Sequence, residues 1–168
     1  RWYYTFLHSK EWGDFTYSLG ASYGYGVGDS GVDGDQLPLF ERYFPGGINT
    51  IRGFKARSLG PREEAKDRYG RIIGTSPIGG TQEAILNNEI IFPLVQGIGL
   101  KGVLFVDAGN AYGSSGFSID ETRLSAGAGV RGLSPVGPLR IEVGKAFRTK
   151  RHDRKSLVLF SFGGPFQF

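Results

Sequence analysis

Few side chains of this sequence have the types and the spacing that catalysis requires. The chain contains no cysteine and only two histidines, His8 and His152, which lie at strand ends or in loops and have no fixed catalytic partner that the sequence identifies. No serine lies in a nucleophile elbow of the G-x-S-x-G type. A hydrolytic triad assembled across strands stays an alternative, but the residues favour a protein that is not an enzyme.

Residues 26–36 contain two patterns that resemble ligand sites. The run GVGDSG, residues 26–31, matches G-x-G-x-x-G, but a dinucleotide site needs a helix to begin there. The following run, VDGDQLPLFERYFP, has two prolines and no apolar stripe of helical period. Asp29, Asp33 and Asp35 lack the spacing and the closing glutamate of a calcium loop. We therefore expect loop carboxylates, with neither a cofactor nor a metal site; an adventitious cation is the alternative.

Arg52 stands out because its neighbours in the sequence are apolar. It directly precedes Gly53 and Phe54, and it follows Gly46 and Gly47, whose backbone freedom allows a sharp turn. If this tip folds into a barrel, the guanidinium requires carboxylate partners, since an unpaired buried charge is very costly. Arginine suits that role because its planar fork can bond two carboxylates at once. The alternative is a solvated loop arginine.

The elements that must position these residues are strands. Seven segments alternate apolar with small or polar residues at a period of two, which is typical of β-strands. None has a convincing helical period, and 28 glycines, 13 phenylalanines and 8 tyrosines favour strands and turns. The expected strands cover residues 2–7, 14–26, 81–92, 100–110, 123–131, 139–144 and 156–168.

The connections between these segments indicate the kind of sheet. Short ones (SKEWG, VQGIG, SPVGP) alternate with longer ones, of which residues 27–80 are the longest. Outer-membrane barrels have tight turns at the periplasmic rim and longer loops outside. The minor face of each strand carries glycine, serine and a few charges, which suits a filled lumen. We predict an all-β fold, an antiparallel transmembrane β-barrel whose apolar face contacts lipid; the alternative is a soluble sandwich or lipocalin-like barrel.

The strand count predicts that the chain is part of a larger barrel. Bacterial single-chain barrels have an even number of strands, eight at least, whereas seven are counted here. We therefore expect residues 1–168 to form the C-terminal portion of a transmembrane barrel whose first strands are absent. Because an open sheet edge in hydrocarbon leaves backbone groups unpaired, the fragment alone is expected to self-associate, misfold or require detergent.

The chain is mildly basic, with a formal net charge of +4 and a basic run RTKRHDRK at residues 148–155. The run lies between two expected strands, and no nucleic-acid recognition motif accompanies it. A solvated hairpin loop explains it, so no nucleic-acid partner is expected.

Two carboxylates lie on strands from which they can reach Arg52. Glu89 in the third expected strand and Asp107 in the fourth occupy the minor faces, which point into the lumen if the apolar faces meet lipid. The long connection is rich in aromatic residues and turn formers and lacks the composition of a disordered segment. We predict that it folds inward and that Arg52 pairs with Glu89 and Asp107.

The loop around Arg52 also resembles that of a known family. It reads FPGGINTIRGF, which is similar to the loop of the BamA-type outer-membrane assembly insertases, the bacterial surface antigen family; their R-G-F tripeptide corresponds to Arg52, Gly53 and Phe54. The resemblance continues through NNEIIFPL, LFVDAGNAYG, SAGAGVRGLSPVGPLRIEVGKAF and the aromatic C-terminus. In that family the loop arginine packs against acidic residues of neighbouring strands, and Glu89 and Asp107 stand at the matching positions.

The resemblance implies a protein that folds and inserts β-barrel proteins into the bacterial outer membrane without nucleotide hydrolysis. It implies unfolded outer-membrane proteins as clients, outer-membrane lipids and lipopolysaccharide as surroundings, and accessory lipoproteins bound through POTRA domains that this chain lacks. The alternatives are the pore of a secretion transporter of the same superfamily, a translocation-assembly relative, a passive porin and a soluble sugar-binding sandwich.

The terminal segment SLVLFSFGGPFQF predicts a weakly paired last strand. Proline cannot donate to the ladder, and Gly163 and Gly164 weaken the pairing, so the strand could open and template an incoming one. Under the resemblance, the aromatic end is also the chain's own insertion signal; an ordinary aromatic girdle is the alternative. We expect four phenylalanines to face lipid and anchor the seam: Phe160, Phe162, Phe166 and Phe168.

Overall fold

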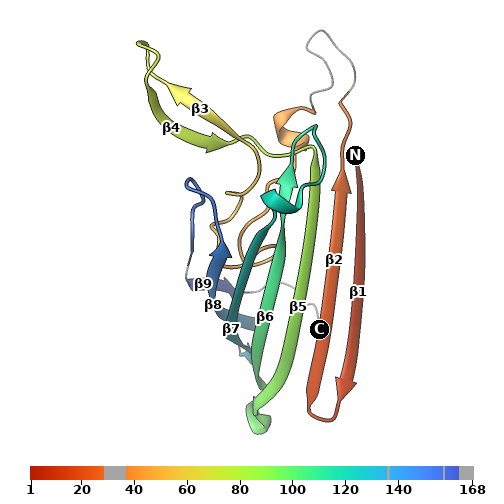
Figure 1. Ribbon diagram of the computed structural model, residues 1–168. Coiled ribbons are helices and arrows are strands. Elements are labelled where there is room, and N and C mark those ends of the chain that lie inside the picture. Colours follow the sequence, from red (N-terminus) through yellow and green to blue (C-terminus); the bar gives the residue numbers. More distant parts are fainter. Residues whose placement is uncertain (29–36, 136, 157, 163–168) are drawn as a thin grey trace.

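The computed structural model describes residues 1–28, 37–135, 137–156 and 158–162. In this part of the chain, seven antiparallel strands form one curved sheet, with β1 and β9 at its two open edges (Figure 1). The predicted all-β, antiparallel fold is confirmed, and the sheet is not closed. In spatial order, the strands are β1 Trp2–Trp12, β2 Phe15–Tyr25, β5 Gln82–Val95, β6 Leu100–Tyr112, β7 Arg123–Ser134, β8 Gly137–Arg148 and β9 Val158–Phe162.

The more apolar face of the sheet is the exposed one. Leu104 and Val106 of β6 are 49% and 46% exposed, whereas Val103, Phe105 and Asp107 on the alternate face are almost completely buried. A soluble antiparallel sheet packs its apolar face on a core and exposes its polar face. The inverted arrangement therefore favours a wall whose outer side contacts lipid.

Aromatic side chains mark both ends of this outer face. Trp2 stacks on Tyr25 with 6.4 Å between ring centroids, and Trp12 stacks on Tyr17 with 6.5 Å. The two tryptophans are about 34 Å apart along β1, and a strand tilt of about 45° reduces this to roughly 24 Å of membrane thickness. Outer-membrane barrels have an apolar band of about 25 Å flanked by aromatic girdles, which this spacing matches.

The first strand is longer than the sequence pattern predicts. The prediction that SKEWG, residues 9–13, is a connection is wrong, because β1 continues to Trp12 and pairs with β2 over its whole length. Lys10 is of a type common in loops, but it continues the alternation of side chains along β1 and pairs with Tyr17 of β2. Its ammonium lies 5.3 Å from the centroid of the Trp12 ring. The turn contains only Gly13 and Asp14, and Gly13 adopts a φ of +61°.

The long connection, predicted as a loop over residues 27–80, contains regular secondary structure. A 3-10 helix, η1, covers Leu39–Glu41, and a hairpin of β3 Arg62–Lys66 and β4 Ile72–Pro77 projects beyond the main sheet (Figure 1). Both hairpin strands are short and largely exposed. They therefore lack the alternation that reveals a half-buried strand in a sequence.

Two further 3-10 turns lie in the other connections. η2 Gln96–Ile98 joins β5 to β6, and η3 Ile119–Glu121 lies between β6 and β7. Within the described ranges, no helix has the length and apolar composition needed to cross a bilayer.

Candidate functional site

The candidate site is the contact between the inner face of the sheet and residues 43–61, here called the inward loop. Tyr43, at the start of this loop, and Gly80, just before β5, are joined by two backbone hydrogen bonds of 2.9 Å that close the segment 43–80. Gly46 and Gly47 adopt φ angles of +114° and +99°, a region that favours glycine. The turn that they form directs the tip of the loop toward the sheet.

The tip of the inward loop is buried. Ile51, Phe54 and Leu59 are inaccessible to solvent and form an apolar cluster with Ile85 of β5. Phe54 is also the bridge partner of Lys155 in the connection between β8 and β9. The tip therefore packs against the wall, as predicted for an inward-folding loop.

Arg52 lies inside this contact, with 1% of its surface exposed. Its Nε donates to Asp107 Oδ2 at 2.6 Å, its Nη2 donates to Asp107 Oδ1, and its Nη1 donates to Glu89 Oε1. The guanidinium carbon lies 3.7 Å from the centroid of the Phe105 ring, so the cation also stacks on an aromatic face. The structure thus brings Arg52 together with both carboxylates predicted from the sequence.

The surroundings of Arg52 keep its guanidinium charged. Burial alone would lower its pKa, but the hydrogen bond and charge of Asp107, followed by the charges of Glu89 and Glu142, raise the pKa above its ordinary value. The five N–H donors of a planar fork can meet acceptors on several sides, whereas a lysine ammonium is a compact point charge. The site therefore requires arginine rather than any cation.

Asn87 links the inward loop to Asp107. Its Nδ2 donates to the Thr50 carbonyl at 2.6 Å and to Asp107 Oδ1 at 2.8 Å. The Asp107 carboxylate also accepts the backbone N–H of Arg52 at 3.0 Å. Asp107 consequently anchors both the backbone and the side chain of the loop tip.

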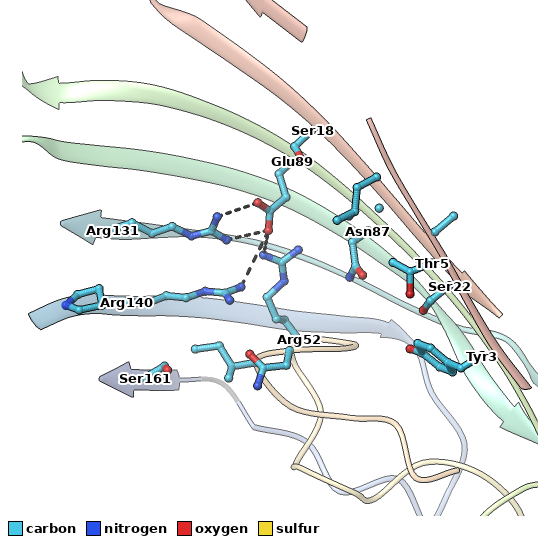
Figure 2. A pocket seen from close by; sticks show the side chains of 16 residues that line it. Tyr3, Thr5, Ser18, Ser22, Arg52, Asn87, Glu89, Arg131, Arg140 and Ser161 are labelled. Atoms are coloured by element: carbon cyan, nitrogen blue, oxygen red, sulfur yellow. Dashed lines mark hydrogen bonds and ion pairs between the residues drawn. The ribbon is translucent and has the colours of Figure 1, made fainter. Parts of the chain in front are cut away.

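Three residues that the sequence pattern did not single out complete the site: Glu142, Arg131 and Arg140. Glu142 is inaccessible to solvent and accepts hydrogen bonds from Arg52 Nη1 at 3.2 Å, Arg131 Nε at 3.0 Å and Arg140 Nε at 2.7 Å. Arg131 also donates to Glu89 through both Nη atoms, at 2.8 and 2.7 Å (Figure 2). The formal charges of the network cancel, because it contains three arginines and three carboxylates: Arg52, Arg131, Arg140, Glu89, Asp107 and Glu142.

The register of β7 and β8 creates this cluster. Arg131 and Arg140 are direct partners in the antiparallel pairing, where two like charges repel. Glu142 follows Arg140 by two residues on the same face and bonds both arginines, which offsets the repulsion. Alternation alone assigns all three side chains to the inner face, but only the register and the depth of the loop bring them to Arg52.

Two glycines allow the backbone of the inward loop to approach the wall closely. Gly53 adopts a φ of +86°. A methyl group added to Gly144 of β8 would lie only 2.8 Å from the Gly53 nitrogen. The loop therefore rests directly on the β8 backbone at a position where a side chain has no room.

The predicted C-terminal residues are placed only in part. Phe160 and Phe162 of β9 are 63% and 51% exposed on the outer face, where they can contact lipid. Gly163, Gly164, Phe166 and Phe168 lie outside the described residues.

The described part of the chain contains no group of three or more His, Cys, Asp or Glu side chains that could hold a metal ion. His8 stacks on Phe6 in β1, and His152 is exposed in the connection between β8 and β9. The chemistry that the arrangement supports is ionic anchoring of a loop to a sheet.

Replacing Glu142 with glutamine is expected to destabilise the docked loop. The amide keeps the shape of the carboxylate but leaves three arginines facing two carboxylates, and loss of a buried ionic partner costs about 3–5 kcal/mol. The measurement is the temperature at which the complete barrel loses its compact mobility in SDS electrophoresis, and a clear decrease is expected. Glu63→Gln, which changes an exposed carboxylate of β3, is the control; equal temperatures for the two variants would contradict the prediction.

Comparison with known proteins relates this chain to one family. Residues 1–167 match the model of the Omp85 superfamily domain. The chain is 29% identical to the outer membrane protein assembly factor BamA of Neisseria meningitidis serogroup B over 198 residues, covering 98% of this chain and 24% of that protein. It is 39% identical to BamA of Nitratidesulfovibrio vulgaris over 129 residues, covering 75% of this chain and 15% of that protein. The chain thus spans a quarter or less of these curated relatives.

A solved structure has the same fold. BamA from Haemophilus ducreyi lacking POTRA domains 1–3 superposes with a TM-score of 0.74 over 88% of this chain and 31% of that chain, at 21% sequence identity. At this identity, the likeness establishes the architecture of the wall and not its activity.

Proposed function

The chain belongs to the Omp85 superfamily, and from this we propose that it forms the C-terminal part of an outer-membrane barrel that folds and inserts other β-barrel proteins. Its barrel lies in the bacterial outer membrane, with the apolar face of the sheet toward lipid. Relatives that are named outer membrane protein assembly factors support the proposed activity.

The observation that carries the proposal is the inward loop, fixed to the wall through Arg52. The loop is held inside the wall by ion pairs to Glu89, Asp107 and Glu142, which argues against an open diffusion pore. Such a buried network costs desolvation and defines one geometry. We infer that it stiffens the wall formed by β5 to β8 while β9 remains able to exchange its partner.

The proposed mechanism is strand addition at β9. In the described part of the chain β9 pairs with β8; in the complete barrel its other edge would meet the first strand, and a weak seam there could open to a strand from an unfolded client. Backbone pairing at a sheet edge supplies affinity, and the alternating side chains of the client can then meet lipid on one face. Satisfying backbone groups in hydrocarbon is itself favourable, so the step requires no nucleotide.

The partners follow from this mechanism. Unfolded outer-membrane proteins are the proposed clients, and outer-membrane lipids with lipopolysaccharide surround the wall. Accessory lipoproteins would bind POTRA domains that precede the barrel in the complete protein. Without the remaining strands, the fragment is proposed to self-associate through the open edges of β1 and β9.

The test is the folding rate of a urea-unfolded outer-membrane protein in liposomes with and without the complete protein. An acceleration of roughly tenfold or more without nucleotide is expected, which corresponds to about 1.4 kcal/mol or more in the barrier. An unchanged rate, together with single-channel conductance, would instead assign the barrel to a secretion transporter or a porin.

A further inference from the structure

We propose that Arg123 and Asp153 form a second anchor of the inward loop, separate from the Arg52 network. Arg123, the first residue of β7, donates through Nε to Asp153 Oδ2 at 2.6 Å and through Nη2 to Asp153 Oδ1 at 3.1 Å. Their side chains are only 6% and 2% exposed. A buried, bidentate ion pair of this kind holds residues 149–156, between β8 and β9, against the wall.

The conformation of this connection depends on the same carboxylate. Asp153 Oδ2 accepts the backbone N–H of Lys150 at 2.6 Å, and the Asp153 N–H donates to the Lys150 carbonyl at 3.0 Å. Arg123 Nη1 also donates to the Glu121 carbonyl at the end of η3. One carboxylate therefore sets the turn of the connection and its position on the wall.

The connection pairs directly with the tip of the inward loop. The Lys55 N–H donates to the Arg154 carbonyl at 2.8 Å, and the Ser156 N–H donates to the Gly53 carbonyl at 3.0 Å. Because Asp153 immediately precedes Arg154, a displacement of its turn moves this short ladder and the loop backbone with it.

The same ladder connects the inward loop to the edge strand. Ser156 Oγ donates to the carbonyl of Val158, the first residue of β9, at 3.1 Å. The carboxylates that hold Arg52 belong to β5, β6 and β8. Arg123 and Asp153 are therefore positioning residues that fix the loop tip relative to the start of β9. Their effect on client assembly rests on the proposed function. Their effect on the docking of the inward loop does not depend on that function.

The variant Asp153→Asn tests this anchor in the complete protein in detergent. Cleavage by proteinase K within residues 53–58 is expected to become at least about tenfold faster, because Arg123 loses its buried charged partner. Cleavage of the β3–β4 hairpin and the heat-dependent mobility of the barrel are expected to stay at parental values. Asp120→Asn is the matched control, since it removes a carboxylate at the end of the wall where η3 lies; that side chain is 96% exposed and pairs with Arg148 at 3.4 Å.

Loop cleavage at the same rate in Asp153→Asn and Asp120→Asn would overturn the proposal. An acceleration that includes the hairpin equally would also overturn it, because it would report a general loss of stability. Since the readout is loop cleavage, failure of the complete protein to accelerate client folding would count against the proposed function and leave this result unaffected.

Discussion

Replacing Arg52 with alanine is expected to release the inward loop from the wall. The substitution removes every guanidinium bond to Asp107, Glu89 and Glu142 and leaves buried carboxylates without that cation. Breaking a buried ion pair in this way costs about 3–5 kcal/mol, which raises the undocked fraction of the loop by roughly a hundredfold or more. The measurement is the rate at which proteinase K cleaves residues 51–58 in the complete protein, and a comparable increase is expected.

One further variant separates the role of the Arg52 fork from that of its charge, and another serves as the control. Arg52→Lys keeps the charge but loses the planar donors, so we expect it to resemble Arg52→Ala. Arg68→Ala removes an arginine from the exposed tip of the β3–β4 hairpin, where the guanidinium carbon lies 5.0 Å from the Tyr69 ring centroid. Loop cleavage in Arg52→Ala at the rate of Arg68→Ala would mean that the ionic network does not hold the loop.

The substitution Gly144→Ala is expected to lift the loop from β8 without changing any charge. The added Cβ would lie 2.8 Å from the Gly53 nitrogen and 3.1 Å from its Cα, and both are backbone atoms. Overpacking of a close contact typically costs about 1–3 kcal/mol. We therefore expect hydrogen exchange of the amides in residues 50–58 to accelerate by roughly tenfold or more, as measured by mass spectrometry on the complete protein.

Gly74→Ala provides the control for this effect. Gly74 lies in β4, where an added Cβ would meet no atom within 4 Å, and its φ lies outside the positive range. Parental exchange rates in the inward loop are expected for this variant. The same rates in Gly144→Ala would show that the loop does not rest on the glycine backbone of β8.

The faces of the wall could be predicted because side-chain alternation is a local property of a strand. Glu89 and Asp107 were assigned to the inner face from their own segments, and the structure places both beside Arg52. Glu142 and Arg131 follow the same alternation in their strands and are buried. Their contact with Arg52 was not predictable, because it depends on the register between β7 and β8 and on how deeply the loop inserts.

The elements that the sequence pattern missed have weak local signals. The end of β1 was missed because Lys10 and Glu11 resemble turn residues, although they only continue the alternation up to the true turn at Gly13. The β3–β4 hairpin was missed because neither of its faces is buried, so no apolar period distinguishes it from a loop. The ion pair of Arg123 and Asp153 joins residues thirty positions apart, and no spacing rule connects them.

The role of the docked loop in client assembly is tested most directly by measuring how fast the complete protein folds a urea-unfolded client in liposomes. The parent, Arg52→Ala and Arg68→Ala are compared at equal protein density. Because the docked loop is proposed to stiffen the wall beside β9, Arg52→Ala is expected to fold the client roughly tenfold more slowly, while Arg68→Ala keeps the parental rate. A parental folding rate in an Arg52→Ala protein whose loop is demonstrably cleavable would contradict a role for the docked loop in assembly.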